Sequence, residues 1–185
     1  MKVNFPVLVN KKIVYGLEEM VEEINRYNGK TNLKMSLYAL GSLYQGNPVW
    51  EDIYVDKLLI ECTAEDCKKL SEKIKEYSIM FVDKEHFYFI FPIEPQVNQL
   101  KDVSAKWEKE LNTELGINIT VNCIVNKMIF VPNTLNLTTG KFVIPVEASE
   151  VSFQEELEKI AENQRLSKDV KRIIKDGSST NSLDK

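Results

Sequence analysis

The sequence is poor in the residues from which many polar sites are built. Its 185 residues include one histidine, three cysteines and three arginines, although lysine and arginine together number 24. Arginine is the residue best suited to bidentate contacts with phosphate or guanine. Its scarcity argues against sequence-specific reading of DNA, and the net charge of −4 provides no overall attraction to nucleic acid.

The few cysteines point to free thiols. Cys62, Cys67 and Cys123 contain no Cys-x-x-Cys pair, and their odd number disfavours a disulfide framework. We expect these thiols to be buried. Together with the single histidine, His86, they do not make a plausible four-ligand zinc site.

Long apolar runs are also missing. None approaches the roughly 18 residues that a membrane span requires, and the longest, at 79–82 and 86–93, have the length of strands. The first residues lack the charged-then-apolar layout of a signal peptide. We therefore expect a cytoplasmic protein without membrane association, long enough for one domain with its own core.

Hydrophobic spacing predicts an α+β fold, with helices packed on a mixed or mostly antiparallel sheet. Helices are predicted at 17–27, 63–77, 98–115, 151–161 and 168–174. Strands are predicted at 5–10, 33–40, 53–62, 78–82, 86–93 and 141–146, with a hairpin of 117–125 and 128–131. Residues 1–148 would form the α/β domain, 149–176 C-terminal helices, and 177–185 a disordered tail.

Four segments carry a resemblance to a known family. Residues 131–141 contain Thr-Leu-Asn-x-x-Thr-Gly, and His86 precedes an apolar strand. Glu61-Cys62-Thr63 ends a strand before a helix, and Gly-Ile-Asn follows a helix at 116–118. In this order, over residues 33–147, they resemble motifs of the archaeo-eukaryotic primase/primase-polymerase superfamily. The resemblance implies a primase/RRM-like core topology and, in active members, metal-dependent nucleotidyl transfer.

The departures from the family pattern fall on its metal ligands. Glu61 is an acid, but Thr63 and Asn118 stand where the resemblance implies two further carboxylates. Divalent cations such as Mg²⁺ require anionic oxygen ligands. The glycine-rich turn before the histidine is replaced by the charged turn 82–85. The resemblance therefore implies a catalytically inactive relative with no bound metal cofactor.

The same resemblance indicates where nucleotide or nucleic acid would make contact. These candidates are Lys84, His86, Thr134, Asn136 and Lys141. For His86 the alternative is a structural, hydrogen-bonded ring, and for Glu61 it is a neighbour of helix amides. We expect the aromatic run at 86–91 to be a buried central strand.

The C-terminal region offers a second surface, where an acidic segment passes into a basic one. Its candidates for docking a protein partner or touching phosphate are Arg165, Lys168, Lys171 and Arg172. The alternative is a pair of solvated helices packed on the sheet.

Three functions remain open from the sequence. The first is an inactive primase-like subunit or accessory protein of DNA replication or repair. It would bind a partner primase or polymerase subunit, or single-stranded nucleic acid. The second is an active nucleotidyltransferase that holds Mg²⁺ or Mn²⁺ with Glu61 and the relocated acids Asp52, Asp56, Asp83 and Glu85. The third is an unrelated intracellular interaction domain.

Overall fold

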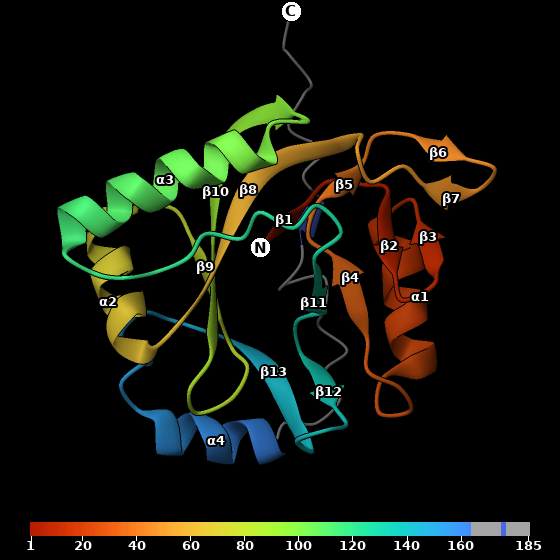
Figure 1. Ribbon diagram of the computed structural model, residues 1–185. Coiled ribbons are helices and arrows are strands. Elements are labelled where there is room, and N and C mark those ends of the chain that lie inside the picture. The colour runs from red at the N-terminus through yellow and green to blue at the C-terminus, as the bar shows by residue number, and fades with distance from the viewer. Residues whose placement is uncertain (164–174, 177–185) are drawn as a thin grey trace, which may run out of the picture.

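A six-stranded antiparallel sheet forms the centre of the protein, whose computed structural model describes residues 1–163 and 175–176 (Figure 1). Its strand order is β12-β13-β9-β10-β8-β5. The strands are β5 (Ala39–Leu40), β8 (Ile53–Cys62), β9 (Ser78–Phe81), β10 (Phe87–Val97), β12 (Thr134–Asn136) and β13 (Lys141–Val146).

A second, four-stranded sheet has the order β11-β4-β2-β3. Its members are β2 (Val7–Val9), β3 (Lys12–Val14), β4 (Lys34–Ser36) and β11 (Met128–Phe130). Two short pairs complete the strands: β1 (Lys2–Val3) runs parallel to β14 (Lys175–Asp176), and β6 (Leu43–Tyr44) pairs with β7 (Asn47–Pro48).

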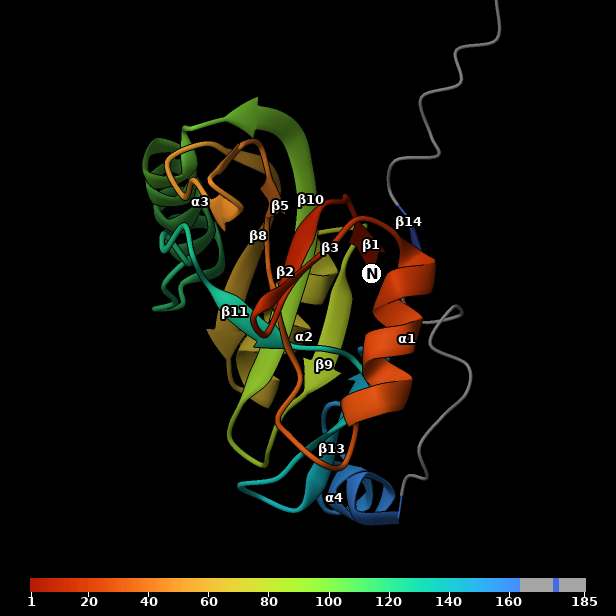
Figure 2. The same ribbon diagram turned by 90° about the vertical axis from the view of Figure 1, so that its right-hand side faces the viewer.

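Helices cover both sides of this arrangement. They are α1 (Leu17–Tyr27), α2 (Ala64–Lys73), α3 (Leu100–Leu115) and α4 (Gln154–Asn163). Figures 1 and 2 place α1 beside the small sheet and α3 on the opposite side of the molecule, with the strands between them. The predicted α+β class is confirmed. Within the described part of the chain, no helix combines the length and the apolar character needed to cross a membrane.

The core is built on the aromatic face of β10. Phe87, Phe89 and Phe91 are almost completely buried, which confirms the predicted central strand. Phe89 stacks on Tyr77 with ring centroids 4.9 Å apart, and Phe91 meets Trp107 of α3 edge-on at 5.2 Å. Because aromatic pairs add to the free energy of burial, these contacts fix α3 and the connection between α2 and β9 against the sheet.

The predicted hairpin of residues 117–125 with 128–131 is wrong. Met128–Phe130 pairs with β4, while the earlier segment reaches the free edge of β8 through a single bridge between Ile60 and Val121. The N–H of Asn122 donates to the carbonyl of Leu59 at 2.9 Å. Alternating apolar residues predict an extended segment but do not specify its partner, and β5 covers only the first part of β8.

The cysteines are all free thiols, as expected, but they differ in exposure. Cys62 and Cys67 are buried, with their sulfur atoms 3.2 Å apart in a hydrogen bond. That hydrogen bond and burial raise the pKa of the Cys62 thiol. Cys123 is exposed, so the expectation of burial is wrong there. Its segment lies along an edge of the sheet and covers the core with only some of its side chains.

Candidate functional site

Five of the predicted site residues line one cavity of about 670 Å³, referred to below as the motif cavity. Glu61 and Thr63 come from the junction of β8 and α2, Lys84 and His86 from the turn before β10, and Asn118 from the segment after α3. The remaining lining residues are Cys62, Ala64, Asp66, Glu85, Ile119, Thr120 and Gln154. In Figure 1 the end of β8, the start of α2 and the turn between β9 and β10 lie toward α4.

Local structure accounts for the position of Thr63 in this cavity. Thr63 caps α2: its hydroxyl oxygen accepts a hydrogen bond from the N–H of Asp66 at 3.3 Å, and the hydroxyl donates to the Asp66 carboxylate at 2.9 Å. A cap of this kind satisfies one of the unpaired amides at a helix start. The Thr63 side chain is therefore engaged in ending β8 and starting α2.

Glu61 makes an ion pair with Lys127. The Glu61 side chain is 44% exposed, while that of Lys127 is 21% exposed. Lys127 lies in the loop just before β11, 66 residues away in the chain, and no local sequence signal marks it as a partner. The carboxylate at the first motif is thus neutralised by a lysine that the sequence analysis did not single out.

His86 is held by its own turn. Its ring Nδ1 lies 2.8 Å from Oδ1 of Asp83, and its backbone N–H donates to the same oxygen at 3.0 Å. The ring is more than half exposed, and β10 begins one residue later. His86 thus has the structural, hydrogen-bonded ring that is the alternative to a nucleotide contact. The preceding turn, rather than the strand, holds the ring in place.

Strand β10 also places Tyr88 beside the acids of the cavity. The register of β10 on β8 sets Tyr88 opposite Glu61. Burial, and then the charges of Glu61 and Asp83, raise the pKa of Tyr88 to about 12. The buried position of the Tyr88 hydroxyl, and after it the two nearby carboxylates, therefore disfavour its ionised form.

Acidic side chains dominate the motif cavity. Glu61, Asp66 and Glu85 line it, against the single lysine Lys84. Carboxylates next to an incoming triphosphate would repel it unless divalent cations lay between them. Among residues 1–163 and 175–176, no group of three or more His, Cys, Asp or Glu side chains is arranged to hold a metal ion.

The four relocated acids do not meet at Glu61. Asp83 lies in the His86 turn and Glu85 lines the motif cavity, but Asp56 lines a different cavity. The backbone carbonyl of Asp52 accepts from the N–H of Gly41 at 2.8 Å, in the connection between β7 and β8.

Lys84 and Lys141 both pair with one acid of α4. Glu158 lies 3.0 Å from the Lys84 ammonium and 2.6 Å from that of Lys141, and Glu162 lies 3.5 Å from Lys141. Hydrogen bonds, first from Lys141 and then from Lys84, lower the pKa of Glu158. Two lysines predicted to touch nucleotide are thus already neutralised within the chain.

This triad predicts a pH-dependent contribution of Glu158 to stability. A carboxyl whose pKa is lowered on folding stabilises the protein above its unfolded pKa, and that contribution is lost as pH falls through the folded value. Glu158→Gln should therefore be less stable than the unchanged protein at pH 7, and the gap should close as pH falls below the ordinary value of 4.5. Urea midpoints across this pH range measure the difference in stability.

Glu156→Gln, at an exposed position on the same helix, is the matched control for the Glu158 prediction. An equal loss from both variants would contradict the prediction.

Thr134 and Asn136 lie outside the motif cavity and shape their own turn. The Thr134 hydroxyl donates to the carbonyl of Val131 at 2.6 Å. The Asn136 side-chain oxygen accepts from the N–H of Thr138, and its carbonyl accepts from Gly140, whose φ is +69°. The Asn136 bonds shape the turn from β12 to β13, while the Thr134 bond holds the chain just before β12. A nucleotide contact at these two residues stays a prediction.

A second cavity, referred to below as the lysine pocket, was not anticipated from the sequence. It has a volume of about 680 Å³ and lies at the β2–β3 turn, the end of α1 and β4. Lys11, Lys12 and Lys34 line it together with the half-exposed ring of Tyr27. Lys12 pairs with Glu23 at 2.9 Å, whereas the Lys34 ammonium lies 4.9 Å from the centre of the Phe130 ring. The pocket therefore has a positive surplus in a protein whose net charge is negative.

Some predicted features lie outside the described residues. These are the helix at 168–174, the tail at 177–185, and the candidate partner contacts Arg165, Lys168, Lys171 and Arg172.

Comparison with known proteins identifies one distant structural neighbour. No protein-family model and no curated protein sequence matches the chain. The polymerase domain of Mycobacterium tuberculosis Ligase D, solved in complex with DNA, is similar over 76% of this chain, with 12% identity and a TM-score of 0.46. The match spans 62% of that neighbour's chain. A likeness at this level carries no argument about function.

Proposed function

We propose that the chain is a catalytically inactive, primase-like accessory module of DNA replication or repair that binds single-stranded nucleic acid. The observation that carries the first part is the charge arrangement of the motif cavity. Residues that resemble primase-polymerase motifs, in their order along the chain, line one cavity, yet Thr63 and Asn118 supply neutral oxygens and Glu61 is paired with Lys127. A two-metal nucleotidyl transfer needs converging anionic ligands.

The lysine pocket supports the second part of the proposal. Proteins that bind single strands without sequence preference combine cationic grooves with aromatic faces on which bases stack. Lys11 and Lys34 supply ammonium groups without carboxylate partners among the described residues, and the Tyr27 side chain is partly exposed. The scarcity of arginine agrees with contacts to the phosphate backbone rather than with reading of base edges.

Catalysis is tested by incubating the protein with a primed single-stranded template, nucleotides, and Mg²⁺ or Mn²⁺. We expect no primer extension above a no-enzyme control. Metal-dependent extension that Glu61→Ala abolishes would overturn the inactive assignment.

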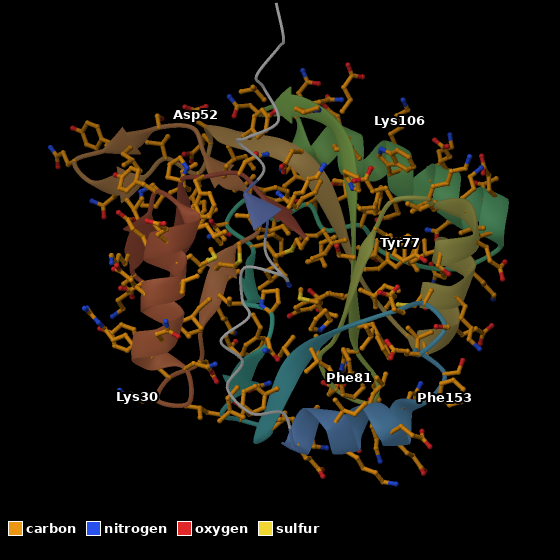
Figure 3. All side chains as sticks on the ribbon, turned by 180° about the vertical axis from the view of Figure 1, so that it is seen from behind. Lys30, Asp52, Tyr77, Phe81, Lys106 and Phe153 are labelled. Atoms are coloured by element: carbon orange, nitrogen blue, oxygen red, sulfur yellow. The ribbon has the colours of Figure 1, made fainter. Side chains whose placement is uncertain are left out.

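Binding is tested with a fluorescent single-stranded oligonucleotide. We expect a salt-dependent association that Lys11→Glu with Lys34→Glu weakens at least about tenfold, with a shallower salt dependence. Lys106→Glu, an exposed lysine of α3 labelled in Figure 3, should leave the affinity nearly unchanged. No association at low salt, or an equal loss from the control, would overturn the nucleic-acid part. A protein partner would then be the remaining function of this module.

A further inference from the structure

A third cavity, of about 730 Å³, is separate from the motif cavity and the lysine pocket. It is bounded by the N-terminal segment, the first half of β8 and the second half of β10. Tyr77, labelled in Figure 3 at the connection between α2 and β9, forms part of its wall. No motif in the sequence points to this place.

The polar lining of this cavity centres on a buried ion pair, and Lys2, Glu76 and Ser78 are further polar residues of this lining. The side chains of Asp56 and Lys57 are 11% and 6% exposed, and the ammonium lies 2.5 Å from one carboxylate oxygen. The side-chain amide of Asn4 donates to the other oxygen. All three residues line the cavity.

Folding alone does not explain this pair. Removing two charges from water costs so much that an apolar pair of similar volume is often equally stable or more so. Both residues belong to β8, an inner strand of the six-stranded sheet, where an apolar side chain would pack well. The cavity beside them provides another reason for retaining two opposite charges.

The pair offers donors and acceptors to a ligand. A lysine ammonium has three N–H donors, and among the described residues Asp56 is the only hydrogen-bond partner of the Lys57 ammonium. The carboxylate has lone pairs beyond those taken by Lys57 and Asn4. The Lys57 ammonium, a donor, therefore lies next to the Asp56 carboxylate, an acceptor. A ligand with a carbonyl group next to an N–H would match this pair.

Aromatic and apolar side chains make up much of the remaining wall. Phe5, Tyr54 and Tyr77 present partly buried rings, and Pro92 and Ile93 add apolar surface from β10. Aromatic walls with a few convergent polar groups, at this volume, are typical of sites for small organic ligands. Ring faces favour a planar ring in offset or edge-on contact.

We propose that this cavity binds a planar heterocycle with a lactam edge, as a base or nucleoside of the uracil or guanine type. The ring carbonyl would accept from Lys57, the adjacent ring N–H would donate to Asp56, and the ring would lie between the aromatic walls. This site is independent of the proposed single-strand binding, which uses the lysine pocket.

The test measures binding of uridine and guanosine to the full chain by calorimetry and by amide chemical-shift changes. We expect saturable binding with Kd below about 1 mM and shifts at Asn4, Lys57 and Ser78. N3-methyluridine keeps both carbonyls but lacks the ring N–H, so it should bind at least about tenfold more weakly. This comparison needs no variant of the protein.

Variants provide the second arm. Asp56→Asn should weaken uridine at least about tenfold, and Tyr54→Leu should weaken it without changing the charges. Lys11→Glu with Lys34→Glu, which tests the nucleic-acid proposal, should leave nucleoside binding unchanged. No nucleoside binding at millimolar concentration, equal affinity for N3-methyluridine, or preferential binding of a zwitterionic amino acid such as leucine would each overturn the proposal.

Discussion

Replacing Lys57 by methionine is expected to lower the free energy of unfolding by about 3–5 kcal/mol. The change leaves the Asp56 carboxylate buried, with only the Asn4 amide as a partner. The full stability of a domain of this size is about 5–15 kcal/mol. Urea unfolding followed by circular dichroism would measure the loss.

A double variant separates the destabilisation caused by one unpaired buried charge from the contribution of the ion pair to stability. Asp56→Leu combined with Lys57→Met removes both charges, so most of the lost stability should return. Lys69→Met is the matched control, because Lys69 pairs with Glu65 across one turn of α2 and both side chains are exposed, at 39% and 77%. A loss at Lys57 no larger than at Lys69 would show that the buried pair carries no special cost. A double variant that is stable but fails to bind uridine would assign the pair to the ligand.

Replacing Phe89 by alanine is expected to destabilise the protein by about 3–5 kcal/mol. Phe89 has no exposed surface, and its ring lies between Tyr77, at 4.9 Å, and Phe91, at 6.3 Å between centroids. The truncation loses both the burial of the ring and its aromatic contacts, and it leaves a cavity at the centre of β10. Thermal and urea unfolding would measure the change.

Phe153→Ala is the control for this prediction. Phe153, labelled in Figure 3 just before α4, is 57% exposed, so its truncation should change stability by less than about 0.5 kcal/mol. Equal losses from the two variants would mean that β10 does not organise the core.

Local pattern was sufficient to predict most single helices and strands. The spacing of Met20 and Ile24 predicts α1, and both side chains are buried on its inner face. Gly116 directly follows the helix predicted at 98–115, and it ends α3 with a left-handed backbone at φ 60°. A helix period, a cap and a strand alternation are each properties of a few consecutive residues. They are therefore readable without knowledge of the fold.

The family resemblance provides information of a different kind, because it predicts which distant segments contribute to the same site. Glu61, Thr63, His86 and Asn118 were selected on motif order, and they line one cavity. Thr134 and Asn136 belong to the same set of motifs, but they lie in β12, away from that cavity, where their side chains bond to nearby backbone groups.

The sequence by itself determined the α+β class, the positions of most helices and strands, and the absence of carboxylates at Thr63 and Asn118. Only the tertiary structure decided which charges meet: Glu61 with Lys127, and Glu158 with the two lysines at 84 and 141. The same holds for the cavity beside the buried pair on β8. Hydrophobic periodicity depends on residues that are neighbours along the chain. The partner of a charged side chain, and the sheet edge that a strand joins, depend instead on how segments tens of residues apart pack together.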